Sequence, residues 1–173
     1  MQRRPQNVTE RSVYFASQKP VNAALIDWRK TAQEIIALSR GLDYQETDNP
    51  LSAVKLCLAG QYYLLQGDVS LVDVATGQKP GSVLSLENDS FTVAAGDKAV
   101  KIQSLSTLEG KRIKLNDVDG LEQGASLTLL DDMLLKQFDE VYQQIGKAEK
   151  YWQTKLYDVE PFTFAGHGAK PIT

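Results

Sequence analysis

The 173-residue chain has only one cysteine and one histidine, the residues on which disulfides, many metal sites and many catalytic sites depend. Its single cysteine, Cys57, excludes a disulfide within the chain and fits a reducing compartment. Its single histidine, His167, lies in a Gly-His-Gly stretch with no neighbour that could orient it as a general base or ligand. We therefore interpret His167 as a solvated tail residue.

Long apolar runs are also missing. No stretch is long enough to span a membrane, and the first residues lack the apolar core of a signal peptide. We expect a cytoplasmic protein without a membrane partner.

An excess of positive charge is missing as well. The net charge is −3 and the isoelectric point is about 5.2. A nucleic-acid surface needs basic residues to displace counterions, yet acidic residues outnumber basic ones within residues 50–126. This balance makes nucleic acid an unexpected partner.

Short alternating segments separated by turns fill residues 50–126. Val54, Leu56 and Leu58 alternate with Lys55 and Cys57, as in a half-buried strand. Further strands are expected over 62–65, 69–74, 83–86, 91–95, 100–103 and 112–115, with a turn or bulge at 67–68 and tight turns at 88–89 and 96–97. No helical pattern lies between them to serve as a crossover. The pattern predicts an α+β, mainly β fold, built on a small OB-like antiparallel open barrel, with a β-sandwich as the alternative.

Helical patterns flank the predicted barrel. Thr31 and Glu34 have the spacing of a capping box, and Ile35 and Ile36 then mark one face of an amphipathic helix. Trp28 can pack on that face. The helix is expected to lie on the barrel.

The longest helical pattern covers residues 127–159. Its apolar residues recur at alternating steps of four and three: Leu134, Phe138, Val141, Ile145, Ala148 and Trp152. Such a seam can serve a coiled coil or a helix packed on a neighbour. The aromatic residues and the small Ala148 favour packing on a neighbouring domain over a regular coiled coil.

These patterns divide the chain into four expected parts. An extended linker (1–24) precedes a barrel domain with a leading helix (25–126), and a helical linker (127–160) leads into a flexible tail (161–173).

Several polar residues have ordinary structural interpretations. Asp131 and Asp132 are expected at a helix start, where negative charge is favourable, rather than at a metal site. Asp27 is expected in a local turn or cap rather than against a substrate. The cations of residues 111–114 fit the solvated face of a strand better than an RNA or phosphate site. Cys57, mid-strand and without a histidine partner, is expected to be a small buried hydrophobe rather than a nucleophile. We therefore assign no catalytic, cofactor-binding or metal-binding residue.

A series of short motifs resembles one known family in order and spacing. The motifs are Ala-Leu-Ile-Asp-Trp at 24–28, Ala-Gln-Glu-Ile at 32–35, Ser-Arg-Gly-Leu at 39–42, Asn-Pro-Leu at 49–51, Lys-Pro-Gly-Ser-Val at 79–83, Phe-Thr-Val-Ala-Ala-Gly-Asp-Lys-Ala-Val-Lys-Ile at 91–102 and Leu-Glu-Gly-Lys at 108–111. They resemble the interdomain segment and C-terminal domain of methionyl-tRNA formyltransferase-like enzymes. The resemblance implies an OB-like C-terminal domain. It also implies that the catalytic Asn, His and Asp and the 10-formyltetrahydrofolate site lie in an N-terminal Rossmann-like domain. No position here matches that catalytic motif, so we expect neither a cofactor nor catalysis from this chain alone.

A second resemblance lies in the long helical pattern. Residues 148–156 are similar to the Glu-x-x-Trp-x-x-x-Leu helix in linkers of nonribosomal peptide synthetases. This implies a formyltransferase-like unit fused to such a synthetase, with neighbouring domains and a phosphopantetheine-bearing carrier protein as partners. The leading hypothesis is a noncatalytic domain that supports the catalytic domain and the access of a carrier-bound aminoacyl acceptor. The alternatives are an architectural spacer without substrate contact and a tRNA-binding module.

Overall fold

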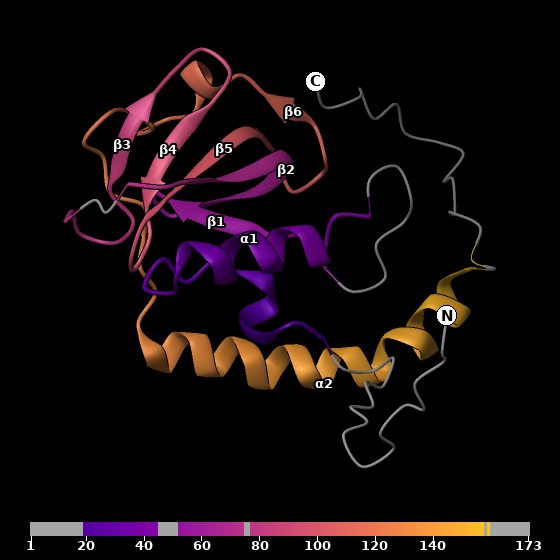
Figure 1. Ribbon diagram of the computed structural model, residues 1–173. Coiled ribbons are helices and arrows are strands. Elements are labelled where there is room, and N and C mark those ends of the chain that lie inside the picture. The colour runs from indigo at the N-terminus through magenta and orange to yellow at the C-terminus, as the bar shows by residue number, and fades with distance from the viewer. Residues whose placement is uncertain (1–18, 45–51, 75–76, 158, 160–173) are drawn as a thin grey trace, which may run out of the picture.

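The computed structural model describes residues 19–44, 52–74, 77–157 and 159. The strands are β1 (Lys55–Leu58), β2 (Gln61–Val72), β3 (Val83–Leu86), β4 (Phe91–Ala94), β5 (Ala99–Ser106) and β6 (Arg112–Ile113). They form one antiparallel sheet in the order β1-β2-β5-β4-β3, and β6 pairs with the end of β5. The sheet curves into a half-barrel (Figure 1), which confirms the predicted mainly β, OB-like open barrel.

A bulge shapes the long strand β2. The sequence predicts two strands separated at residues 67–68, whereas the structure has one strand whose register against β5 shifts between Gln66 and Val69. Gly67 adopts a positive φ of 74° there, and the Ser104 hydroxyl donates to the Gln66 carbonyl at 2.7 Å. Because a bulge bends and twists its strand, β2 can pair with both β1 and β5.

Residues 124–128 join the two edges of the half-barrel. The amide of Val83, on β3, donates to the Ala125 carbonyl at 2.8 Å, and the amide of Thr128 donates to the carbonyl of Cys57, on β1, at 2.9 Å. The helix predicted from Leu127 therefore begins later, as α2 (Asp132–Tyr157). Backbone groups that pair with sheet edges are not available for the first turn of a helix.

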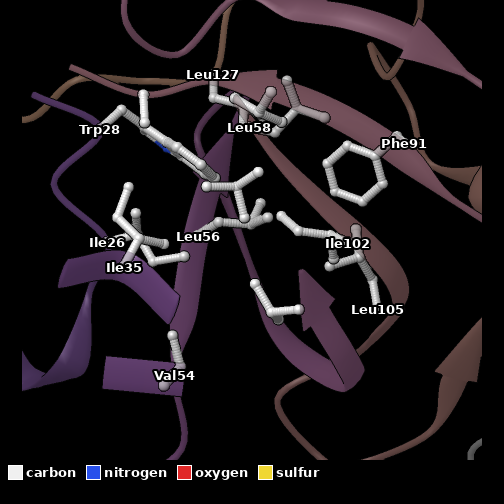
Figure 2. Packing of buried hydrophobic residues seen from close by; sticks show 14 of the residues in the cluster. Ile26, Trp28, Ile35, Val54, Leu56, Leu58, Phe91, Ile102, Leu105 and Leu127 are labelled. Atoms are coloured by element: carbon white, nitrogen blue, oxygen red, sulfur yellow. The ribbon is translucent and has the colours of Figure 1, made fainter. Parts of the chain in front are cut away.

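The core lies between the sheet and helix α1 (Ala32–Gly41), which contacts β2 and β5. Its fully buried side chains include Trp28, Leu56, Phe91, Ile102 and Leu105 (Figure 2). Residues Val54, Leu56 and Leu58 point into this core, as their alternation predicts.

Cys57 faces the other side of β1. It packs with Leu25 and with Leu135 of α2 in a second, smaller apolar cluster. The prediction that Cys57 is a small buried hydrophobe is confirmed.

Three local expectations differ from the structure. Strand β4 is buried on both faces rather than alternating. The strand expected over 112–115 ends at Ile113, and the buried Leu115 instead opens a 3-10 turn, η3 (Leu115–Asp117). Within the expected extended linker, η2 (Val21–Ala24) is a turn with positive φ at residues 22–24. Residues 1–18, most of the 41–50 loop and His167 with the tail lie outside the described residues.

Helix α2 runs beneath η2 and α1 in the view of Figure 1 and contacts η2. None of the helices in the described part of the chain has the length and apolar character that a membrane span requires.

Candidate functional site

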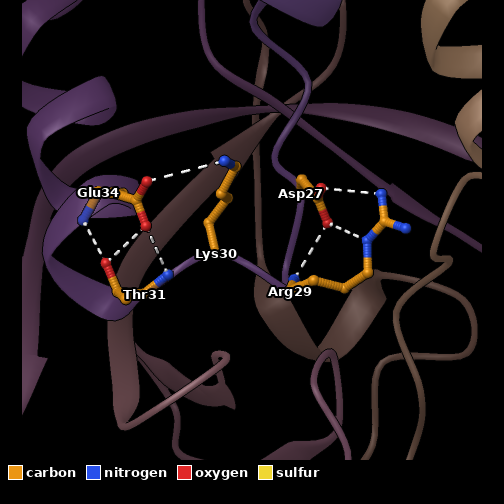
Figure 3. Close-up of polar contacts among 5 residues, drawn as sticks. All are labelled: Asp27, Arg29, Lys30, Thr31 and Glu34. Atoms are coloured by element: carbon orange, nitrogen blue, oxygen red, sulfur yellow. Dashed lines mark hydrogen bonds and ion pairs between the residues drawn. The ribbon is translucent and has the colours of Figure 1, made fainter.

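The loop that leads into α1 carries a dense set of hydrogen bonds and ion pairs (Figure 3). The Arg29 guanidinium donates to both carboxylate oxygens of Asp27, at 2.8 and 2.9 Å, and the Arg29 amide donates to the same carboxylate at 3.1 Å. These bonds from Arg29 hold the pKa of Asp27 below its usual value. Asp27 therefore closes a local turn, as predicted.

Arg29 also ties this loop to α2. Its Nη2 lies 2.7 Å from Oδ1 of Asp132, the first residue of the helix. The neighbouring Asp131 accepts from the Leu134 amide at 2.7 Å and so caps the helix. The prediction that these two acids mark a helix start is confirmed. Among the described residues, no cluster of side chains has the composition of a metal site.

The predicted capping box is present at the start of α1. The Glu34 amide donates to the Thr31 hydroxyl at 3.3 Å, and the Thr31 amide donates back to the Glu34 carboxylate at 3.0 Å. These bonds from Thr31 lower the pKa of Glu34. Lys30 adds a longer ion pair to the same carboxylate at 3.8 Å.

The turn between β4 and β5 holds this loop from the sheet side. The Gly96 amide donates to the Lys30 carbonyl at 2.8 Å, and Asp97 Oδ1 accepts from the Ala32 amide at 2.8 Å. A Cβ on Gly96 would lie only 2.3 Å from the Arg29 carbonyl oxygen. Two of the motifs that carry the family resemblance, at 32–35 and 91–102, are therefore in direct contact through Ala32 and Asp97. We call the contacts among Arg29, Lys30, Ala32, Gly96, Asp97 and Asp132 the clamp, because they hold α1 and α2 to the barrel.

The clamp makes a testable prediction about pH. The bond from the Ala32 amide holds the pKa of Asp97 below its ordinary value. An acid whose pKa is lower in the folded state stabilises the fold above its unfolded-state pKa, and this contribution is lost as pH falls through the folded-state value. We therefore expect the free energy of unfolding to decline below about pH 4, near the unfolded pKa of an aspartate. Urea unfolding at a series of pH values measures this decline.

The variant Asp97→Ala isolates the contribution of the clamp. It is expected to lower stability at neutral pH and to flatten the decline in acid, whereas Asp89→Ala, at an exposed turn, is expected to change neither. Equal acid profiles for both variants would contradict a role for the bond between Asp97 and Ala32.

Lys55 has an environment that sequence reasoning missed. Its side chain is partly buried, and the ammonium donates to the carbonyls of Ala23 and Ala53 at 2.9 and 2.8 Å and to the Ser52 hydroxyl at 2.8 Å. Burial lowers the pKa of Lys55. All three of its donors are used to hold the turn of η2, so Lys55 is a structural residue rather than a reactive amine. The alternation of strand β1 predicted only that it lies opposite the core.

A hollow of about 470 Å³ lies between the end of α1 and the bulge of β2. It is lined by Ser39, Leu42, Tyr44, Leu65 and Gln66, among others. The Ser39 hydroxyl is buried and has no hydrogen-bond partner among the described residues. Sequence reasoning missed this hollow, and the glycines at its two sides, Gly41 at the end of α1 and Gly67 in the bulge, are only weak signals for it.

The basic residues of the barrel are mostly engaged or exposed. Lys98 lies 2.6 Å from Asp73, and Lys101 lies 3.1 Å from Glu87. The cations at 111–114, Lys111, Arg112 and Lys114, are exposed around β6, as predicted for a solvated face.

Comparison with known proteins finds the same family that the motifs at 32–35 and 91–102 resemble. The sequence matches the formyl transferase C-terminal domain family over residues 20–120. It is similar to the methionyl-tRNA formyltransferases of Stenotrophomonas maltophilia, with 32% identity over 114 residues, and of Bacillus mycoides, with 33% identity over 110 residues.

These alignments cover 66% and 63% of this chain but only 34% and 33% of the two relatives. The chain thus spans about a third of the length of the curated relatives it matches. The part of a formyltransferase that these matches detect is the C-terminal domain, which is consistent with the catalytic domain being absent from this chain. The family match extends over more than half of the sequence, and the chain belongs to the formyl transferase C-terminal domain family.

Proposed function

We propose that this chain is the noncatalytic C-terminal domain of a formyltransferase-like unit within a nonribosomal peptide synthetase. Its role is to brace the catalytic domain and to shape the access of an aminoacyl group bound to a carrier protein. The cofactor, 10-formyltetrahydrofolate, would bind to the catalytic domain and not to this barrel. The site of action is the cytoplasm.

The observation that carries this proposal is the use made of the charged residues near the family motifs. Asp27 fixes Arg29 in the loop, while Arg29 and Asp97 hold α2 and α1 in place, so the bonds of these three described residues are structural and do not form an acid–base pair poised for chemistry. A domain of this construction supports a reaction that takes place elsewhere.

The choice of acceptor rests on charge. Several cations of the barrel and its leading loop pair with carboxylates, as Arg29, Lys98 and Lys101 do. The net charge is −3. A surface that binds tRNA must instead neutralise many phosphates. A carrier protein makes a smaller demand, which the exposed cations around β6 can meet.

Titration of the isotope-labelled chain with an aminoacyl carrier protein tests this function. We expect saturable chemical-shift changes that centre on β6. The variant Arg112→Glu should weaken binding about tenfold or more, because it places like charge against an acidic partner. The matched variant Arg40→Glu, at the exposed end of α1, should leave binding unchanged.

The other outcomes separate the alternatives. An architectural spacer would give no shift changes with the carrier protein. A tRNA-binding module would bind RNA with a steep dependence on salt. Formyl transfer by this chain alone, above background, would overturn the noncatalytic assignment.

A further inference from the structure

Helix α2 carries a long apolar stripe, most of which the barrel does not cover. Its seam residues Leu134, Phe138, Val141, Ile145 and Trp152 are 39%, 39%, 53%, 57% and 56% exposed. The helix contacts the rest of the molecule mainly through other residues, such as the buried Leu135 and Gln143, which donates to the Lys19 carbonyl at 3.3 Å. Of the seam residues, Phe138 also faces the barrel side, where it lines a hollow of about 220 Å³ with Leu25 and Tyr62. A contiguous apolar stripe of this kind on a soluble protein marks an interaction surface.

The spacing of the seam is self-complementary when two copies run antiparallel. With the register centred at the height of Gln143, Leu134 lies opposite Trp152 of the other copy. Likewise Val141 lies opposite Ile145, and the large Phe138 lies opposite the small Ala148. With alternating steps of four and three, the seam residues occupy heptad positions d and a in turn. In each of these layers a d residue of one helix therefore lies opposite an a residue of the other. The irregular residue sizes, which argued against a regular coiled coil, compensate each other in this arrangement.

The charges along α2 are also arranged for antiparallel pairing. The first half of the helix is mainly acidic, with Asp132, Asp139 and Glu140 against one Lys136, although Asp132 already pairs with Arg29. The second half is mainly basic in sequence, with Lys147, Lys150 and Lys155 against one Glu149, which pairs with Lys19 of the same chain. Antiparallel packing brings the acidic half of each helix beside the basic half of the other, whereas parallel packing would bring like charges together.

From the exposed seam, the layer complementarity and the charge polarity, we propose that α2 docks against α2 of a second copy of this chain, antiparallel and about a two-fold axis. The contact is isologous, so the same surface of both copies is covered and the assembly closes as a dimer. This proposal does not depend on the identity of the formyl acceptor.

Sedimentation equilibrium of the 173-residue chain over a wide range of concentration tests the dimer. The variant Val141→Glu is expected to raise the dimer dissociation constant about tenfold or more, because it places a charge in an apolar layer. Glutamate is a better helix former than valine, so α2 itself should persist, which circular dichroism verifies. The matched variant Val74→Glu changes a valine of similar exposure, 58%, outside α2 and should leave the dissociation constant unchanged.

Disulfide formation tests the register. Mixing Val141→Cys chains with Ile145→Cys chains should give mixed disulfide-linked dimers faster than either variant forms them alone, with the buried Cys57 present in both. A chain that stays monomeric at every concentration would overturn the proposal, and would leave the seam to a neighbouring domain. Faster self-linkage of each single variant would indicate parallel helices and would equally overturn it.

Discussion

Replacing Trp28 by alanine is expected to lower the free energy of unfolding by about 3–5 kcal/mol. The indole is fully buried between the loop that leads into α1 and the segment around Leu127 (Figure 2). Removing it leaves a cavity where α1, the sheet and the closing segment 124–128 meet, and none of these can collapse without breaking its own hydrogen bonds. Such a loss is a large fraction of the 5–15 kcal/mol that is usual for a domain, and urea unfolding measures it.

The chain provides its own control, because it has only two tryptophans. Trp152 is 56% exposed on α2, so Trp152→Ala should change unfolding by about 0.5 kcal/mol or less when the protein is dilute enough to be monomeric. Similar losses for the two variants would show that Trp28 is not a core residue.

A second variant at the same position tests the polar atom of the ring. The Trp28 Nε1 donor is buried without a hydrogen-bond partner among the described residues. Trp28→Phe keeps most of the volume and removes this unsatisfied donor, so it should cost clearly less than alanine. An equal cost would mean that the indole N–H makes a bond that matters.

Local features of this fold were predictable because their causes are local. The capping box depends on two residues three apart, Thr31 and Glu34, and the buried face of β1 depends on strict alternation. The position of Asp131 at a helix start likewise follows from its neighbours alone. Each pattern specifies its structure whatever the rest of the chain does.

The contacts that assemble the clamp were not predictable in the same way. Asp97 reaches the Ala32 amide across 65 positions of sequence, and Arg29 reaches Asp132 from a distant loop. The start of α2 was misplaced for a related reason, because Thr128 is held by the carbonyl of Cys57. A hydropathy pattern cannot predict such pairings, because they depend on where the backbone passes rather than on which side chains are apolar. The family resemblance pointed to the right motifs without saying that they touch.

Gly96→Ala is expected to destabilise the fold by about 3 kcal/mol, at the upper end of the range for overpacking. The new methyl group would meet the Arg29 carbonyl oxygen at 2.3 Å and the Lys30 carbonyl oxygen at 3.0 Å. Both are backbone atoms, so no side chain can rotate away to make room. To relieve the clash the turn between β4 and β5 must withdraw, which lengthens the bond from the Gly96 amide to the Lys30 carbonyl. The loss therefore includes part of the clamp as well as the steric strain.

Gly41→Ala is the matched substitution with the opposite expected sign. Gly41 ends α1, its backbone is outside the left-handed region, and no atom of the described residues, apart from its chain neighbours and the backbone of its own helix, lies within 4 Å of a Cβ placed there. The methyl group restricts the unfolded chain and meets nothing, so the variant should gain about 0.5 kcal/mol. Urea unfolding of the two variants side by side separates the steric effect of an added methyl group from its effect on the conformational freedom of the unfolded chain. If both glycines tolerated alanine equally, the close approach of the β4–β5 turn to the Arg29 carbonyl would not exist in solution, and the clamp would have to be discarded with it.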